Sequence, residues 1–266
     1  MIKGLIECLR FFLFIELIFI FIGGSVELLF SESNAGYHNP NILTTLGFLV
    51  AGIAIGIVIF WRFPLIFKKC KYWVQLAKRN VLQFFVIFFS ICLLFSFIIY
   101  LGESTGLVIP IAETNNGISI KTLGSLFIIT LAIGFTEEFI YRGVFFAYFF
   151  EKIGIKPAII LVSLLFSLGH FYYLGLLPFI SAFNLGIVST LLLLKTGSLY
   201  GSIGLHTGWN FIYFFFEKLY ILNAIVVPIW GNLFELFQTG VLLIILISLL
   251  FVKKGFMLGE DKSILS

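Results

Sequence analysis

Two adjacent glutamates, Glu137 and Glu138, interrupt a long apolar segment of this chain. Ionisable side chains at membrane depth are unfavourable, so they are candidates for function by default. On a helix, Glu138 and Arg142 are four residues apart with the acid first, which favours an ion pair and a structural role. Glu137 points about 100° away from that pair and has no partner on its own helix. We therefore expect Glu137 to be a general base or acid.

Two histidines and an asparagine lie in later apolar segments. His206 and Asn210 are one helical turn apart, so both side chains emerge on one face and can present two hydrogen-bond donors to an oxyanion. Phe166 and His170 have the same spacing, which lets the aromatic ring hold the imidazole. Counting along the helices puts Glu137 and His170 about 20 Å deep, and the other pair about 10–17 Å deep. These depths allow the groups to meet near one level.

Each of these residues also has an ordinary structural explanation. A single membrane histidine is often a hydrogen-bonded packing residue, and Asn210 alone would hold two helices together. The set is harder to explain in this way, because three separate apolar segments each carry one polar cluster. The residues that other intramembrane protease mechanisms require are absent from the sequence. The only aspartate is Asp261, which excludes a two-aspartate mechanism, and neither the zinc motif HExxH nor the serine nucleophile motif GxSxG occurs. What remains is chemistry of Glu, His and Asn on water.

Membrane helices must position these residues. The chain is 61% hydrophobic and 11% charged, whereas an ordinary soluble domain has about 25% charged residues. Lipid offers no partner for an open strand edge, so the apolar segments are expected to be helices. The candidate segments are 5–24, 42–61, 81–101, 122–150, 157–174, 177–195, 199–216 and 236–252. We predict an all-α polytopic membrane helix bundle, a single integral membrane domain over 1–266 with about eight transmembrane helices.

The distribution of Lys and Arg predicts the orientation. The stretch 62–80 is rich in both, and the positive-inside rule places it in the cytoplasm. Alternating sides from there gives an N-in and C-in arrangement. The first segment imitates a signal peptide, but Glu7 and Glu16 argue against cleavage, so we expect it to be retained. The formal net charge of +4 is modest, and no nucleic-acid partner is expected.

Three motifs occur in order on the three apolar segments that carry polar residues. A short sequence, Thr-Gly-Ser-Leu at 196–199, precedes the last motif. The motifs are EExxxR at 137–142, FxxxH at 166–170 and HxxxN at 206–210. This ordered set resembles the CAAX-protease and bacteriocin-processing family, the Abi or type II CAAX prenyl endopeptidase-like intramembrane proteases. The likeness covers about residues 120–215, which we take as the catalytic core.

The resemblance implies an intramembrane endopeptidase, a multi-pass protein of the cell membrane that cleaves a membrane-associated protein or peptide. The substrate would be a CAAX-type protein, or a small peptide in bacteriocin or pheromone processing or in self-immunity. The family also implies roles for the matched residues. Glu137, helped by His170, would activate water, and His206 and Asn210 would stabilise the oxyanion.

From their helical spacing, we assign Glu138, Arg142 and Phe166 to structural support. The resemblance leaves a metal ion open, because the family is usually classed with metalloproteases. Two histidines and a glutamate, His170, His206 and Glu137, are a possible ligand set for catalytic zinc. A glutamate that binds zinc cannot also be the base, so versions with zinc and without metal are both kept.

Two other classes of function fit some of these residues. In a proton-coupled transporter, Glu137 and the histidines would relay protons, but the chain has no repeated half and no matching broken helices. A non-catalytic membrane scaffold would not need the complete motif set. Both are kept as alternatives to the protease.

Overall fold

The computed structural model describes residues 2–30, 42–106, 108–110, 119–174, 176–222, 240–242 and 244–245. The main helices in this part of the chain are α1 (Ile2–Phe30), α2 (Ile42–Arg62), α3 (Pro64–Trp73), α4 (Lys78–Ser104), α5 (Ile120–Glu138), the π-helix η2 (Phe139–Phe145), α6 (Phe146–Ile153), α7 (Ile155–Leu174), α8 (Leu176–Thr196) and α9 (Tyr200–Leu219). Two short strands, β1 (Val108–Pro110) and β2 (Tyr220–Leu222), pair antiparallel. The predicted all-α class is confirmed.

Seven of the eight predicted segments coincide with helices, and the eighth, 236–252, lies almost entirely outside the described residues. By length and apolar composition, α4, the continuous helical run 120–153 and α8 can each cross a membrane. Shorter apolar helices occupy 49–62 and 155–168. The chain is therefore a multi-pass membrane protein. Eight crossings, and their orientation, stay predictions.

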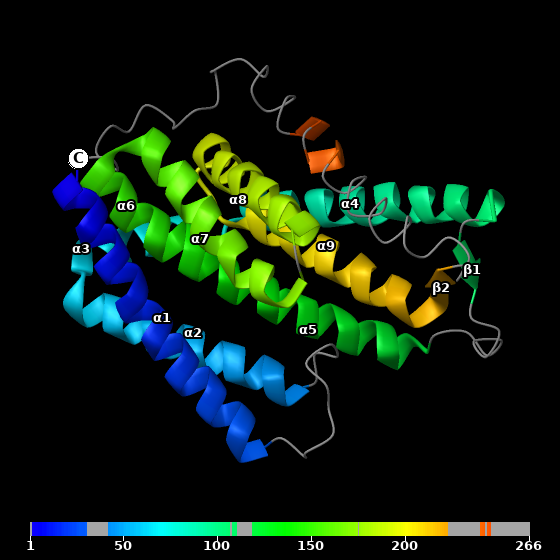
Figure 1. The fold of residues 1–266 in the computed structure, drawn as a ribbon, viewed down its shortest axis with the longest axis horizontal. Helices are drawn as coiled ribbons and strands as arrows, with labels where there is room; N and C mark the ends of the chain where they lie inside the picture. The colour runs from blue at the N-terminus through cyan, green and yellow to red at the C-terminus, as the bar shows by residue number, and fades with distance from the viewer. Residues whose placement is uncertain are drawn as a thin grey trace.

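The helices α3 and α6, which carry basic residues predicted to face the cytoplasm, lie with the start of α1 at one end of the bundle, on the left in Figure 1. Lys69 of α3 pairs with Glu151 of α6 at 2.8 Å, and Lys152 of α6 pairs with Glu7 of α1 at 3.0 Å. The start of α1, α3 and the end of α6 therefore share one end, as the charge pattern requires. Which side of the membrane this end faces stays a prediction.

The basic stretch 62–80 contains a helix that the sequence analysis did not predict. Pro64 begins α3, where its missing N–H is tolerated. The helix buries Cys70 and exposes Lys68 and Lys71. Burial raises the pKa of the Cys70 thiol to about 12. The stretch is therefore a basic amphipathic helix that packs against the bundle.

Glycines bring α9 close to its neighbour α4. A Cβ added at Gly204 would lie 2.5 Å from the backbone oxygen of Phe84, and one at Gly208 would lie 3.1 Å from that of Phe88. Small residues at this spacing let two helix backbones approach closely in lipid. The GxxxG at 204–208 is thus a packing seam between α9 and α4.

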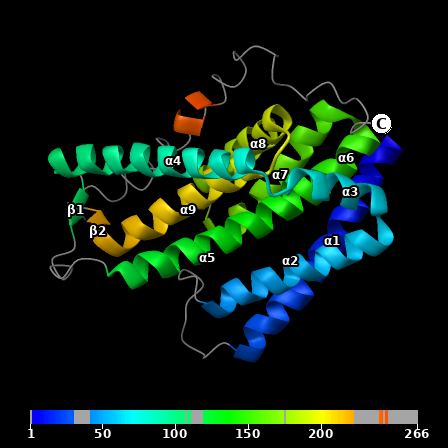
Figure 2. The ribbon, with the colours of Figure 1, turned by 180° about the vertical axis from the view of Figure 1, so that it is seen from behind.

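On its other side, α9 packs against α5. A Cβ added at Gly134 of α5 would lie 2.7 Å from Thr207 Oγ1 and 3.2 Å from the Thr207 backbone nitrogen. Both views show α4, α9 and α5 side by side (Figures 1 and 2). The helix that carries His206 is therefore held between α4 and α5.

The predicted segment 122–150 is not one regular α-helix. It divides into α5, a π-helical turn and α6, and the π turn begins directly after Glu138. A π-helix bonds residue i to i+5, so it fits an extra residue into the turn, and such turns are frequent at functional sites. Arg142 lies within this turn.

Candidate active site

Glu138 joins two helices at the centre of the site. Its fully buried carboxylate oxygen Oε1 lies 3.0 Å from Arg142 Nη1 and 2.9 Å from His206 Nδ1. The ion pair with Arg142 was predicted from spacing, whereas the contact with His206 was not. An ionised carboxylate only accepts hydrogen bonds, so Nδ1 of His206 is the donor. Glu138 is therefore more than a partner for Arg142, because it also orients an imidazole on α9.

Arg142 is completely buried and lies against an aromatic face. Its guanidinium carbon is 4.3 Å from the centre of the Phe166 ring, in a cation–π arrangement. Within the described part of the chain, none of its nitrogens makes an aligned hydrogen bond. Arg142 thus does not form the bidentate pair of hydrogen bonds with Glu138 that an arginine can make to a carboxylate. The close ion pair and the ring hold the charge.

Glu137 points toward the same imidazole from the other side. Its Oε2 lies 3.7 Å from His206 Nε2, and its side chain is 18% exposed. This oxygen is buried and has no hydrogen-bond partner among the described residues. This oxygen of Glu137 thus has no hydrogen bond to its own helix among the described residues, and it faces His206 of α9.

His206 therefore lies between two carboxylates, with one ring nitrogen toward each. Because Nδ1 donates to Glu138, the neutral ring would leave a lone pair on Nε2 toward Glu137. A ring protonated on both nitrogens would instead offer an Nε2–H donor there. His206 could therefore bind a metal only with an unprotonated Nε2, and it could donate to an oxyanion only with a protonated Nε2.

The remaining predicted residues are placed less fully. Asn210 lies one turn after His206 on α9 and is half-buried. His170 belongs to α7, but its side chain lies outside the described residues. Phe166, predicted to hold His170, packs edge-to-face on His206 at 5.8 Å between ring centres and on Tyr141 at 5.1 Å. These two ring contacts join Phe166 to α9 and to the π turn.

Residues 119–212 match the family model described as type II CAAX prenyl endopeptidase Rce1-like. Residues 119–212 are therefore similar to the CAAX-protease family, and we call them the CAAX-protease domain. All four residues predicted to be catalytic lie within the matched range. A search of curated proteins gives no significant match to the chain.

Two donors of the CAAX-protease domain lie at nearly the separation of two ligands on one zinc ion. Glu137 Oε2 and His206 Nε2 are 3.7 Å apart, and two ligands of one tetrahedral zinc ion with bonds of about 2.0–2.1 Å are about 3.3 Å apart. A carboxylate on the far ring nitrogen, as Glu138 provides here, is the usual second partner of a zinc-bound histidine. Within the described residues, no group of three or more His, Cys, Asp or Glu is arranged to hold a metal. The third candidate, His170, is not among the side chains described.

Sequence reasoning missed two residues beside the CAAX-protease motif. Tyr141, the residue before Arg142, donates its hydroxyl hydrogen bond to Glu16 Oε1 of α1 at 3.1 Å. Glu16 is an acid inside an apolar helix, which is itself a signal of function. From the sequence alone, Glu16 served only as an argument against cleavage of the first segment.

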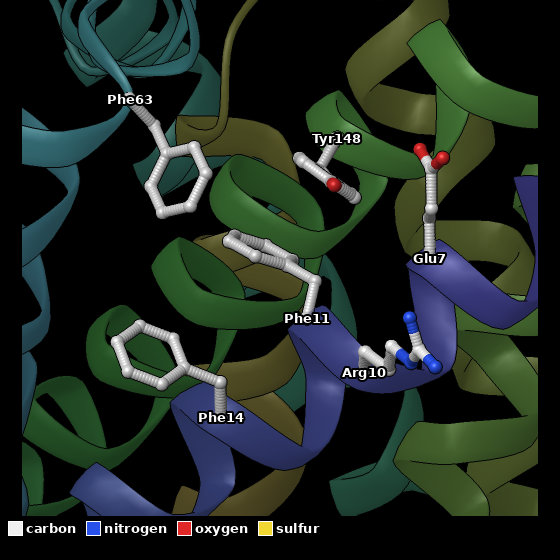
Figure 3. A pocket seen from close by; sticks show the side chains of 6 residues that line it. All are labelled: Glu7, Arg10, Phe11, Phe14, Phe63 and Tyr148. Carbon is white, nitrogen blue, oxygen red and sulfur yellow. The ribbon is translucent and has the colours of Figure 1, made fainter.

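A surface hollow near the start of α1 is separate from these residues. Figure 3 shows the Phe11 ring between those of Phe63 and Tyr148, and Phe11 stacks on Tyr148 at 4.0 Å. Glu7, Arg10 and Phe14 complete the lining. None of the predicted site residues of the CAAX-protease domain contributes to it.

Proposed function

We propose that this protein is an intramembrane endopeptidase that hydrolyses a peptide bond of a membrane-associated protein or peptide. One observation supports this best: His206 lies between two carboxylates, 2.9 Å from the buried Glu138 and 3.7 Å from the half-buried Glu137. The CAAX-protease domain over 119–212 adds the reaction class.

Glu137 is the general base in this proposal. Its carboxylate takes a proton from a water molecule, helped by His170, and the resulting hydroxide attacks the carbonyl carbon of the peptide. Protonated Glu137 then gives that proton to the leaving nitrogen as the C–N bond breaks, which yields a carboxylic acid and an amine. A carboxylate whose oxygen has no competing hydrogen bond in the described residues suits this exchange.

His206 and Asn210 stabilise the negative oxygen of the tetrahedral intermediate. They lie one turn apart on α9, and His206 is fixed at Nδ1 by Glu138. A fixed donor needs no reorganisation when the charge develops, which is the source of its catalytic effect. In this role the ring carries a proton on each nitrogen, and Glu138 balances the positive charge.

Arg142 and Phe166 act indirectly, through Glu138 and His206. Arg142 pairs with Glu138 at 3.0 Å, and the Phe166 ring contacts both the guanidinium and the imidazole. These contacts fix the position of Glu138, and through it the ring of His206.

The same donors also suit a zinc ion, held by Glu137, His206 and His170. When bound, zinc would polarise the carbonyl and acidify a bound water. In that version His206 is neutral and offers its Nε2 lone pair. Glu138 would still orient the ring by accepting from Nδ1.

The substrate class follows from the domain rather than from any one residue. A type II CAAX prenyl endopeptidase-like domain points first to peptides with a prenylated CAAX end. The proposal extends to other peptides held at the membrane surface, including bacteriocins and pheromones. A transporter or a scaffold has no comparable support.

The test is cleavage by the purified full chain in proteoliposomes, with a farnesylated CAAX-type peptide as first probe. Peptides that accumulate uncleaved in cells producing Glu137→Gln supply further probes. Wild type is expected to cleave, Glu137→Gln to lose cleavage, and Glu103→Gln, the same change at an exposed helix end, to retain it. Equal activity of wild type and Glu137→Gln contradicts the proposal, as does no cleavage of either probe set by wild type.

A further inference from the structure

Glu16 stands alone as an ionisable residue in the middle of α1. Between Arg10 and Glu27 the helix is otherwise apolar except for Ser25. A carboxylate in such a segment is unfavourable unless a polar group meets it. The position therefore needs an explanation beyond packing against lipid.

The polar group that meets Glu16 comes from the π turn. Tyr141 donates its hydroxyl to Glu16 Oε1 at 3.1 Å, in a half-buried contact that joins residues 125 positions apart. Tyr141 follows Glu137 by four residues, about one helical turn, so the hydrogen bond lies near the proposed base.

Tyr141 is tied to the site on several sides. It precedes Arg142 directly, and its ring packs edge-to-face on Phe166 at 5.1 Å and on Phe145 at 5.4 Å between ring centres. Phe166 in turn covers Arg142 and His206. A shift of the Tyr141 ring would therefore move the groups that hold the glutamates.

The same face of α1 reinforces the contact. Phe12, one turn before Glu16, packs on Phe145 at 5.1 Å, and Phe11 packs on the same ring at 6.0 Å. Aromatic rings and one hydrogen bond thus fasten α1 to the π turn. This helix lies outside the matched range 119–212.

We propose that Glu16 is a positioning residue of the active site, which fixes the π turn through Tyr141 and so sets the orientation of Glu137 and Arg142. In this proposal α1 belongs to the catalytic unit, because it carries Glu16. This inference rests on the proposed peptidase function.

The kinetic test uses the full chain in proteoliposomes with the farnesylated CAAX-type peptide, or with a peptide that accumulates in Glu137→Gln cells. Glu16→Met keeps the length but removes the acceptor, and Tyr141→Phe removes the donor. Each is expected to lower kcat about 10-fold to 100-fold with KM unchanged, since small misplacements of reacting groups have effects of this size. The double variant should lose no more than either single variant, because both break one bond.

Two further variants separate positioning from general structure. Glu16→Gln retains an oxygen that accepts from Tyr141, so it should retain most of kcat. Glu7→Gln, on the same helix, breaks the surface pair with Lys152 and should leave kcat unchanged. Thermal unfolding in detergent is measured in parallel, because replacing a membrane carboxylate by methionine should not destabilise the fold.

The outcomes distinguish the two proposals. If wild type cleaves and Glu16→Met has a kcat within about twofold of it, or if the two single losses multiply in the double variant, the role of Glu16 is overturned and the peptidase stands. A Glu16→Met loss fully explained by unfolding also overturns it. If wild type cleaves nothing, the peptidase fails and the role of Glu16 fails with it.

Discussion

His206 Nδ1 lies 2.9 Å from Glu138 Oε1, so the imidazole of α9 is oriented by the carboxylate that ends α5. The same oxygen lies 3.0 Å from Arg142. Glu138 Oε1 thus connects α5, which also carries Glu137, to the guanidinium of Arg142 and to the imidazole of His206. A change at any of these three residues should therefore alter the positions of the others.

Arg142→Lys should reduce folded protein more than it reduces the chemistry of what folds. Lysine keeps the charge but loses the planar contact with Phe166, and a loss of about 1–3 kcal/mol is expected for such a change in a buried network. Glu137→Gln should do the reverse, with normal stability and no cleavage. The measurements are thermal unfolding in detergent and turnover per folded molecule. Equal loss of protein level in both variants would argue against a specific catalytic role for Glu137.

His206 variants decide between the two versions of the mechanism. Without metal, His206→Gln should retain more activity than His206→Ala, because an amide still donates and loss of one oxyanion donor lowers the rate about 10²–10³-fold. With zinc, both variants should lose bound metal, and phenanthroline should abolish cleavage until zinc is restored. Metal analysis of active protein beside Glu137→Gln is the measurement. Near-stoichiometric zinc that disappears in His206→Ala and His170→Ala rejects the metal-free version.

Gly134→Ala should damage the site through the seam between α5 and α9. An added methyl group would meet Thr207 at 2.7 Å, in the residue next to His206. Gly124→Ala on the same helix is the matched control, because nothing lies within 4 Å of its added Cβ. We expect cleavage to fall in the first variant and to stay unchanged in the second, which gains about 1 kcal/mol in helix propensity. Similar activity of both variants would contradict a tight seam at this position.

Labelling of single cysteines introduced at Lys69 and at Ser266 should occur from the cytoplasmic side only. Cys70 gives little background, because it is buried and its pKa is raised to about 12, far above the pH of labelling. Cys8 is buried as well, and Cys92 is changed to serine. Reaction of either introduced cysteine with an impermeant reagent added outside intact cells would reverse the predicted topology.

The sequence predicted what depends on local spacing. The four-residue interval between Glu138 and Arg142 produced the observed ion pair, and the apolar segments produced the helices. It did not predict that His206 would meet Glu138, because that contact depends on how α9 packs against α5. The GxxxG spacing at 204–208 permits close packing of α9, but it does not identify the partner helices.

The π turn and Glu16 were missed for different reasons. Hydrophobic periodicity in a nearly uniformly apolar segment cannot show where one extra residue enters a helix. Glu16 was visible as an acid in an apolar helix, but its partner Tyr141 is 125 residues away in sequence. The catalytic roles of Glu137, His170, His206 and Asn210 stay predictions.

The π turn also changes how mutational scans of the helical run 120–153 must be read. One additional residue in the turn rotates α6 by about 100° relative to a regular continuation of α5. A scan by cysteine or tryptophan should therefore show a period of about 3.6 residues up to Glu138, and the same period with a one-residue phase slip after Phe145. A single helical wheel drawn through both parts would therefore misplace the residues of α6 by about 100°.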